Sequence, residues 1–480
     1  MTVDKTELDK SIKKVQAEFW LPTETLDKIV EYFIEELERG LVDGTDPLGI
    51  PMNLAWVMEY PTGDETGDYL ALDFGGTNLR VVMVHLLGGK KLETEQSFYR
   101  LPHGMRTTKD RNELFEFMAE CLEKFLIEKH PSGIPENKTF PLGFTFSYPA
   151  TQSRIDAGVL QRWTKGFDIP GVEGEDVVPL LMEKVNNRNL PIKVVALIND
   201  TCGALVASRY VDPLTEMGCI FGTGVNGSYY ETVNAIKKVK GQLPADIPED
   251  SPMLINCEYG SFDNAHKVIP RTKYDLKIDA DSPRPGQQTF EKMTAGFYLG
   301  DLMRLVLLDQ YKNGLLFQEA DSKLIKLLET ENCIDTSFLS LIESDESEDL
   351  SLVKKTFADA LHYEDATSDE CYFAKEVAEI IGTRAARLSI CGISAACKKR
   401  GYKNCHVAAD GAVYLKYPNF PERAAEGLAD VFRWGRDLPY DQHPIKIVKA
   451  QDGSGVGAAV IAALSHKRQL QGLSLGLKDE

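Results

Sequence analysis

The sequence lacks the cysteine spacing that builds disulfide frameworks or zinc sites. Its nine cysteines are scattered along 480 residues, their number is odd, and no two of them form a Cys-x-x-Cys pair. This usage is typical of reduced thiols in a cytosolic protein. We interpret the adjacent pair Cys405 and His406 as structural rather than metal-binding.

Targeting and membrane-spanning segments are also missing. The first twenty residues are polar and carry charges of both signs, unlike a signal or transit peptide. No apolar run approaches the roughly 18 residues that a bilayer-spanning helix needs. These absences predict a cytoplasmic protein with no membrane partner.

Positive charge is scarce. The chain has 54 Lys and Arg against 73 Asp and Glu, which gives a formal net charge of −19. A general nucleic-acid binder needs a basic face to displace counterions, so the composition excludes that class of protein. It does not exclude a small phosphorylated ligand, because local cations, Mg²⁺ and backbone dipoles can hold one. The length exceeds one compact core and predicts at least two domains.

Common nucleotide-binding signatures are absent or misplaced. There is no G-x-x-x-x-G-K-[ST] loop and no H-R-D motif of protein kinases. The stretch "GTGVNG" (222–227) matches G-x-G-x-x-G, and Asp246 follows about 20 residues later. That fingerprint requires a helix after its last glycine, whereas "SYYETV" is aromatic and β-branched and predicts a strand. A dinucleotide-binding fold is therefore disfavoured.

What the sequence does contain is a repeated hairpin. "YLALDFGGTNLRVVMVHL" (69–86) and "CIFGTGVNGSYYETV" (219–233) each place a Phe-Gly step and a Gly-rich turn with a Thr between two strand-like runs. One strand–turn–strand unit used twice predicts two related α/β domains that face each other across a cleft.

The two turns are suited to phosphate. Their backbone N–H groups and hydroxyls come from Gly75, Gly76 and Thr77 in the first turn and from Gly222, Thr223 and Gly224 in the second. Glycine matters because a Cβ would keep the backbone away from a phosphate. Asp73, just before the first turn, could hold Mg²⁺ through water. Plain hairpin turns are the alternative.

A third glycine-rich stretch, "DGSGVGAAVIAAL" (452–464), opens a predicted helix. Glycines there serve either the approach of an anionic ligand to a helix N-terminus or the close packing of that helix. The acidic, Ser-rich segment 331–370 is expected to be a solvated surface excursion.

Four polar residues are candidates for chemistry on a hydroxylated substrate. Asp200 ends the strand-like run "VVALIND", where α/β sheets place their ligands, and is a candidate general base. Its structural alternative is a helix N-cap. The other candidates, Asn226, Glu258 and Glu291, suit a polyhydroxylated ligand, although each one taken singly is compatible with a solvated surface position.

Eight motifs carry a resemblance to a known family. In chain order they are "LDFGGTNLR", "FTFSYPA", "RWTKGF", "INDT", "IFGTGVNG", "CEYG", "RPGQQTFEKM" and "DGSGVGAA". On these motifs the chain resembles eukaryotic, fungal-type hexokinases over residues 20–470. The resemblance implies the actin-like ATPase (ribonuclease H-like) α/β fold, in which a small and a large α/β domain close over a central cleft. It implies domains at 15–205, mostly the small one, and 206–465, with a helix from about residue 452 returning to the small domain.

The resemblance also implies residue roles. Asp200 is the implied base for the sugar 6-hydroxyl, and Lys165 the implied contact to the transferring phosphoryl group. The implied sugar contacts are Ser147, Thr164, Lys165, Asn199, Asp200, Asn226, Glu258 and Glu291. The implied ATP contacts are Asp73, Gly75, Gly76, Thr77, Asn78 and Arg80 in the first phosphate loop, Thr223 and Gly224 in the second, and Gly411, Ser454 and Gly455 near the adenosine. Mg²⁺ is held through ATP and water, with Asp73 as the candidate, and not by a direct protein ligand.

The implied activity is ATP-dependent phosphorylation of the 6-hydroxyl of glucose, fructose or mannose, the first step of glycolysis. The resemblance also implies induced-fit closure of the cleft, which the fluorescence of Trp163 is expected to report. The implied assembly is a homodimer in equilibrium with the monomer. A glucose-restricted glucokinase and a catalytically weak sugar-sensing regulator are the alternatives. Two departures affect ATP contacts: Ala412 stands where relatives tend to carry Ser or Thr, and Phe98 where related enzymes carry Lys.

Overall fold

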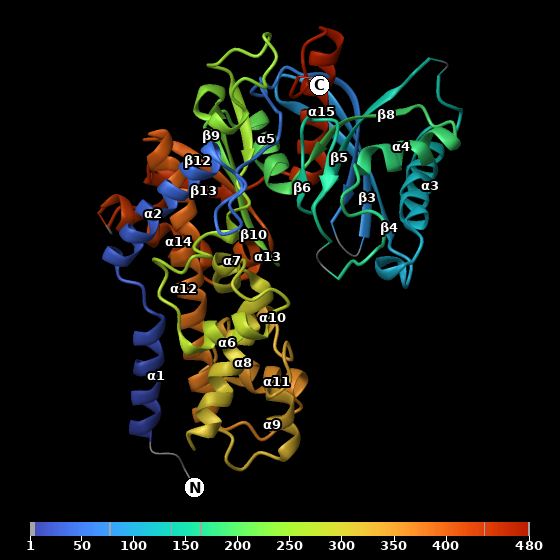
Figure 1. Ribbon diagram of the computed structural model, residues 1–480. Coiled ribbons are helices and arrows are strands. Elements are labelled where there is room, and N and C mark those ends of the chain that lie inside the picture. Colours follow the sequence, from blue (N-terminus) through green and yellow to red (C-terminus); the bar gives the residue numbers. More distant parts are fainter. Residues whose placement is uncertain (1–4, 76–77, 136, 164–165, 436, 479–480) are drawn as a thin grey trace.

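The computed structural model describes residues 5–75, 78–135, 137–163, 166–435 and 437–478. Two α/β units stand side by side, each built on its own sheet, and a column of helices extends from the larger unit (Figure 1). The predicted α/β class is confirmed by these two sheets and by the helices that cover them.

The smaller unit contains a five-stranded sheet in the order β4-β3-β2-β5-β8. Its strands are β2 (Thr66–Phe74), β3 (Asn78–Gly88), β4 (Lys91–Arg100), β5 (Phe140–Phe146) and β8 (Ile192–Ile198). β2, β3 and β4 are antiparallel, whereas β5 runs parallel to β2 and to β8. Helices α3 (Arg111–Lys129) and α4 (Val177–Asn187) cover one face, and β6 (Ala150–Thr151) pairs with β7 (Val159–Leu160) beside it.

Strand alternation divides β2 between two cores. Leu72 and Phe74 are fully buried in the core under α3 and α4, whereas Ala71 is buried in the core of the larger unit. Because successive side chains of a strand point to opposite faces, Asp73 lies on the same face as Ala71. The carboxylate before the first glycine turn therefore points toward the other unit.

The larger unit contains a six-stranded sheet in the order β1-β11-β10-β9-β12-β13. Its strands are β1 (Asn53–Leu54), β9 (Thr215–Phe221), β10 (Val225–Thr232), β11 (Pro252–Asn256), β12 (Cys405–Asp410) and β13 (Ile445–Lys449). β9 and β10 form the second predicted hairpin, since Phe221 pairs with Val225 in antiparallel register. A strand follows "GTGVNG", which confirms that this stretch is not a dinucleotide fingerprint.

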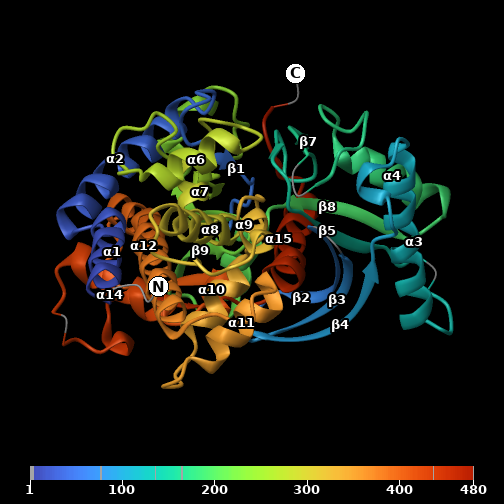
Figure 2. The same cartoon turned by 90° about the horizontal axis from the view of Figure 1, so that it is seen from below.

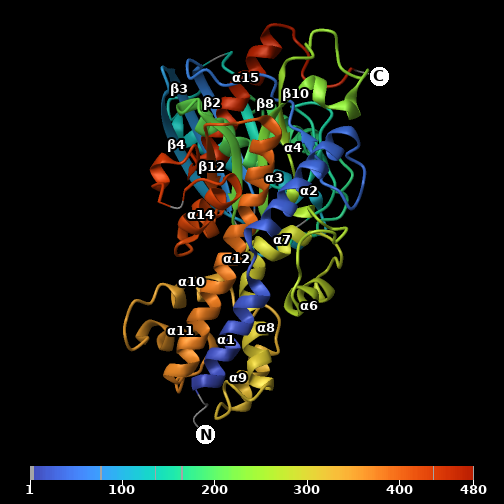
Figure 3. The same ribbon diagram turned by 90° about the vertical axis from the view of Figure 1, so that its left-hand side faces the viewer.

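Helix α12 (Ser368–Arg400) is the core helix of the larger unit and of the column that Figure 3 shows. By length and composition alone it could cross a membrane, but 89% of its most apolar stretch is buried inside the protein. Other helices of this unit are α1 (Lys5–Phe19), α2 (Thr23–Val42), α6 (Lys273–Asp281), α7 (Thr289–Thr294), α8 (Gly296–Lys312), α9 (Ser322–Leu328), α13 (Ala412–Lys416) and α14 (Phe420–Phe432).

The acidic segment 331–370 is not a solvated excursion throughout. It forms α10 (Thr336–Glu343) and α11 (Ser351–Leu361), whose Phe338, Ile342 and Phe357 are buried in the larger core. The prediction was wrong because the acidic and serine residues occupy the outer faces and the helix ends, where Asp335 caps α10.

Two helices join the units. α5 (Asp200–Val211) leaves β8 of the smaller sheet and packs in the larger core. α15 (Ala458–Leu470) follows a five-residue π-helical turn (Gly453–Gly457) and lies against β2, β5 and β8 (Figure 2). Glycine permits this contact: a Cβ on Gly143 of β5 would lie 2.3 Å from the carbonyl oxygen of Ala458, and one on Gly203 of α5 would lie 2.2 Å from that of Gly453.

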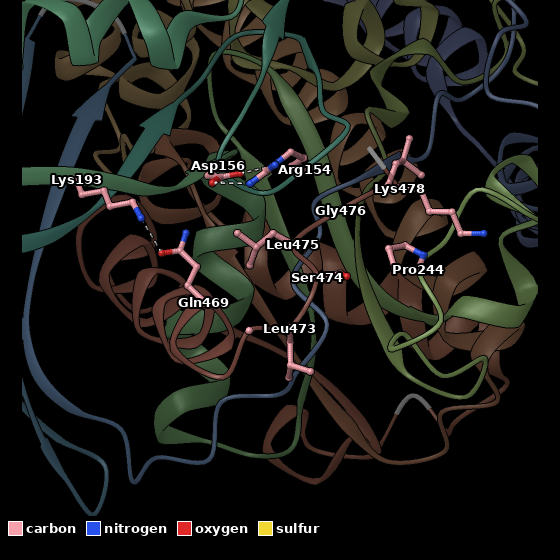
Figure 4. A pocket seen from close by; sticks show the side chains of 12 residues that line it. Arg154, Asp156, Lys193, Pro244, Gln469, Leu473, Ser474, Leu475, Gly476 and Lys478 are labelled. Carbon is pink, nitrogen blue, oxygen red and sulfur yellow. Dashed lines mark hydrogen bonds and ion pairs between the residues drawn. The ribbon is translucent and has the colours of Figure 1, made fainter. Parts of the chain in front are cut away.

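The chain after α15 bridges the units at a distance from the glycine hairpins. Leu477 donates its backbone N–H to Ser153 of the smaller unit, and Ser474 donates to Asp246, which precedes β11. A pocket of about 570 Å³ lies beside this segment (Figure 4). Arg154, Lys193 and Gln469 contribute to its lining, whereas none of the predicted site residues in the described part of the chain does.

Candidate active site

The first glycine turn joins β2 to β3, where Phe74 pairs with Leu79 and Asp73 pairs with Arg80. Gly75 lies beside Ser147, the residue after β5, since a Cβ on Gly75 would lie 3.4 Å from the hydroxyl oxygen of Ser147. The structure thus brings Ser147 to the first turn. Gly76 and Thr77, which we predicted as phosphate contacts, lie outside the described residues.

A polar cluster fixes Asp73 and Arg80. The Ser454 hydroxyl donates to Oδ2 of Asp73 at 2.6 Å, and Nε of Arg80 lies 3.4 Å from the same oxygen. The two terminal nitrogens of Arg80 donate to the two carboxylate oxygens of Asp452 at 2.9 and 2.6 Å, and Nη2 also donates to Ser454. Ser454 therefore lies at the first turn, and its implied contact to the adenosine stays a prediction. Gly455 lies there too, because its N–H donates to Asp452.

Asp452 is a member of this cluster that the sequence reading missed as a site residue. Its side chain caps the π-helical turn before α15 and neutralises Arg80 at the same time. The available signal was an acid at the start of "DGSGVG". Phe98 of β4 is opposite Arg80, its side chain 63% exposed and its ring 5.9 Å from the guanidinium carbon.

The charge on Asp73 is sensitive to its neighbours. Burial raises the pKa of the Asp73 carboxyl, and the negative charges of Asp200 and Asp452 raise it further. The hydrogen bond from Ser454 and the charge of Arg80 oppose that shift. The coupling to Asp200 places the candidate base within electrostatic reach of the first turn.

The second glycine turn lies between β9 and β10. Gly222 donates its N–H to the carbonyl of Gly224, and its own carbonyl accepts from Gly296 at the start of α8. Gly411 lies beside this turn with φ +102°, and a Cβ on it would lie 2.5 Å from the carbonyl oxygen of Phe221. Only glycine is accommodated there, and α13 begins at the next residue, Ala412. The backbone carbonyl of Thr223 accepts from the N–H of Phe297. Because Gly411 lies directly against Phe221, the structure brings the second loop and Gly411 together.

Asp200 is the first residue of α5, but it is not the N-cap. Asn199 holds that position: its Oδ1 accepts from the Thr201 N–H at 2.9 Å and from the Thr201 hydroxyl at 2.7 Å. Asp200 receives one local hydrogen bond, from the same N–H to its Oδ1. Its other carboxylate oxygen accepts none from the described residues. The capping alternative for Asp200 is therefore disfavoured by the structure.

Asn226, Glu258 and Glu291 lie together in the larger unit. Asn226 donates to Oε1 of Glu258 at 3.2 Å, and Asn256 donates to the same oxygen at 2.8 Å. Glu258 has φ +55° and is held by its N–H, which donates to Oδ1 of Asn226. Glu291 accepts from the N–H of Val225, directly after the second turn. The cluster presents carboxylate and amide groups next to the second glycine loop.

Trp163 is part of an aromatic cluster in the smaller unit. Its ring is buried against Tyr148 and Phe167, and its indole N–H donates to the carbonyl of Ile169 at 3.1 Å. Thr164 and Lys165, which follow it, lie outside the described residues.

The described residues contain no group of three or more His, Cys, Asp and Glu side chains arranged to hold a metal ion. All nine cysteines are free, and eight of them are buried. Burial raises the pKa of the Cys121 thiol to about 12 and that of Cys371 to about 11. Such thiols remain protonated at neutral pH and are poor nucleophiles.

Two α/β units, each with a glycine-rich hairpin, and carboxylates distributed over both units define a phosphotransferase of the actin-like ATPase fold. Two hexokinase family models match the chain, one at residues 11–210 and the other at residues 216–464. The chain belongs to the hexokinase family.

Relatives of known identity agree with this placement. Hexokinase-2 of Saccharomyces cerevisiae is 53% identical over 471 residues, covering 98% of this chain and 95% of the relative. The hexokinase of Kluyveromyces lactis is 54% identical over 473 residues, covering 98% and 96%. The solved hexokinase of Schistosoma mansoni in complex with glucose is 32% identical, has a TM-score of 0.83, and covers 96% of this chain and 99% of that one. ATP-dependent phosphorylation of a hexose is therefore the activity of this chain.

Proposed function

We propose that this cleft transfers the γ-phosphoryl group of ATP to the 6-hydroxyl of glucose, fructose or mannose, with Asp200 as the general base. One observation carries the assignment. Asp200 begins α5 with a carboxylate oxygen free of described partners, and it is coupled electrostatically to Asp73 at the first glycine turn. A base placed between the sugar-side and phosphate-side elements is what in-line transfer to a hydroxyl requires.

The phosphate-side residues divide between the units. Backbone N–H groups of the two glycine turns would cradle the phosphates, and Thr223 would add a hydroxyl. The Asp73 carboxylate fits a magnesium ion held through water: Oδ2 is taken by Ser454 and Arg80, while Oδ1 accepts no hydrogen bond from the described residues. Bound Mg²⁺ would neutralise charge on the transferring phosphoryl group. Arg80 would contact phosphate while its guanidinium remains ion-paired with Asp452.

The sugar-side residues would fix the acceptor. Asn226, Glu258 and Glu291 present paired acceptors and an amide donor to the hydroxyls of a hexose. Asp200 would accept the proton of the 6-hydroxyl as its oxygen attacks the γ-phosphorus. The proposed set is completed by Ser147 after β5 and Asn199 before α5, together with Thr164 and Lys165.

We further propose that the protein acts in the cytoplasm and exchanges between monomer and homodimer. Glucose-restricted phosphorylation is the second candidate for specificity, and weak catalysis with sugar sensing is the second candidate for role. The intact arrangement of Asp200, Asp73 and Glu258 favours a working enzyme over a sensor.

The test is a coupled assay of ADP release with ATP, Mg²⁺ and, in separate reactions, glucose, fructose, mannose, N-acetylglucosamine or no sugar. We expect turnover with the first three and little without sugar. Turnover of glucose alone would replace the broad specificity with the glucokinase alternative. Sugar binding without turnover would favour the sensor.

A further inference from the structure

Asn256, the last residue of β11, carries an amide that no sequence motif indicated. Its Cα is paired with Ser228 of β10 on one side and with Asn53 of β1 on the other, so both neighbouring strands fix its backbone. Its side chain is half-buried and donates from Nδ2 to Oε1 of Glu258 at 2.8 Å. The amide therefore contacts a carboxylate of the proposed sugar cluster directly.

The hydrogen bonds around Asn226 determine which way the Asn256 amide is turned. Oδ1 of Asn226 accepts two backbone N–H groups, from Gly227 at 2.7 Å and from Glu258 at 2.9 Å. Its Nδ2 then faces the other way and donates to Oδ1 of Asn256 at 2.8 Å. Because that oxygen of Asn256 is the acceptor, its Nδ2 is the group that faces Glu258. One arrangement of donors and acceptors satisfies all three side chains.

Glu258 needs this support because its own backbone is in an unfavourable conformation. Its φ of +55° and ψ of 41° are left-handed, a region that residues with a Cβ seldom adopt. The preceding Cys257 is held on both sides: its N–H donates to Gly227, and its carbonyl accepts from Met52. After this fixed residue, the left-handed turn brings the Glu258 carboxylate to the two amides. Such conformations persist where surrounding contacts impose them, and they gather at ligand sites.

We propose that Asn256 is a positioning residue for hexose binding, which holds the Glu258 carboxylate in the orientation that accepts from a sugar hydroxyl. The inference rests on the proposed role of Glu258 in contacting the sugar. Asn226 also donates to Oε1 of Glu258, at 3.2 Å, but it is itself a proposed sugar contact, so Asn256 is the amide that supports both. A carboxylate that is already oriented does not have to be ordered when sugar binds, and preorganisation of this kind strengthens binding.

The experiment compares Asn256→Asp with the matched control Asn53→Asp. The first substitution keeps the size of the side chain and the oxygen that accepts from Asn226, but it replaces the donor to Glu258 with a second carboxylate. The control introduces the same charge on the adjacent strand and leaves the amide network in place. The coupled ADP assay gives KM for glucose, KM for ATP and kcat, tryptophan fluorescence gives the glucose Kd, and urea unfolding gives stability.

For Asn256→Asp we expect KM for glucose to rise about 10-fold or more, because repulsion between two carboxylates replaces a charge-assisted hydrogen bond. KM for ATP should stay within a few fold. Asn53→Asp should leave KM for glucose within about twofold, because its charge is screened and no bond to Glu258 is lost.

A double-mutant cycle tests whether Asn256 acts through Glu258. In the otherwise unaltered protein, Asn256→Ala should raise the glucose Kd about 10-fold. In Glu258→Ala the same substitution should raise it by no more than about threefold, because the carboxylate that Asn256 orients is already gone. A merely structural role would give the same factor in both backgrounds.

An unchanged KM for glucose in Asn256→Asp would overturn the proposal, and so would an equal rise in Asn53→Asp or independent effects in the cycle. Where one of the two Asn256 variants does not fold, the other decides. Failure of the proposed function is separable, because it would show as an unchanged KM for glucose in Glu258→Gln. Failure of this inference alone leaves the effect of Glu258→Gln intact.

Discussion

Substituting Asp200 separates its proposed chemical role from a structural one. In Asp200→Ala the cap of α5 remains, because Asn199 and not Asp200 receives both hydrogen bonds from Thr201 that close the first turn. The variant loses only a local contact at 2.9 Å to a backbone N–H that Asn199 also satisfies. We therefore expect the free energy of unfolding to change by no more than about 0.5 kcal/mol.

The catalytic effect should be far larger. Loss of a general base lowers kcat by about 10²–10⁴-fold, equivalent to roughly 3–5 kcal/mol of activation free energy. Asp200→Asn should lose as much as Asp200→Ala, because the amide keeps the shape and cannot accept the proton. Glucose should still bind, since Asn226, Glu258 and Glu291 remain.

The matched control is Asn199→Ala, which removes the cap and should cost about 0.5–2 kcal/mol of stability. Urea unfolding gives the stability of each variant, the coupled ADP assay gives kcat, and quenching of tryptophan fluorescence gives glucose binding. The reasoning is refuted if Asp200→Ala retains kcat within a few fold of the unaltered protein while losing as much stability as Asn199→Ala.

Three further outcomes are expected. Glu258→Gln or Glu291→Gln should raise KM for sugar about 10–100-fold and leave KM for ATP within a few fold. Thr223→Val should instead raise KM for ATP and leave KM for sugar within a few fold. Initial rates measured with each substrate varied in turn test this, and the opposite pattern would mean that the two sites are exchanged. Fructose and mannose should be phosphorylated alongside glucose in the same assay, and their complete rejection contradicts broad specificity. Burial lowers the pKa of Lys238 to about 8. Between pH 8 and about 10.4 the unfolded chain therefore binds more protons than the folded one, so the free energy of unfolding should rise with pH across that window. Urea unfolding compares the unaltered protein with Lys238→Met, and parallel pH profiles of the two proteins would exclude the shift.

Local patterns were sufficient to predict the hairpins. Alternating strands around "FGGTN" and "FGTGVN" specify tight turns from neighbouring residues alone, and the structure has β2–β3 and β9–β10 there. The same holds for Asp200, which the sequence placed at the end of a strand and the structure places at β8–α5.

The cluster around Asp73 was less accessible to sequence reasoning. Arg80 and Asp452 are 372 residues apart, and they meet only because α15 crosses to the smaller sheet. Such a contact depends on how closely backbones approach at Gly143 and Gly203, which no local pattern reports. Composition also misled over 331–370, where α10 and α11 bury apolar side chains and where the acidic Glu343 at the end of α10 is itself buried against Arg423.

The division of the site between two units addresses a problem that every hexose kinase faces. Water is a smaller nucleophile than any sugar hydroxyl, so a site that kept Asp200 permanently beside the γ-phosphate would hydrolyse ATP. Here Asp73 belongs to the smaller sheet, the second glycine turn belongs to the larger one, and α5 with Asp200 connects them. Sugar that contacts Glu258 of the larger unit and Ser147 of the smaller unit would draw the units together. The catalytic arrangement would then be complete only when the proper acceptor is present, and closure would exclude competing water.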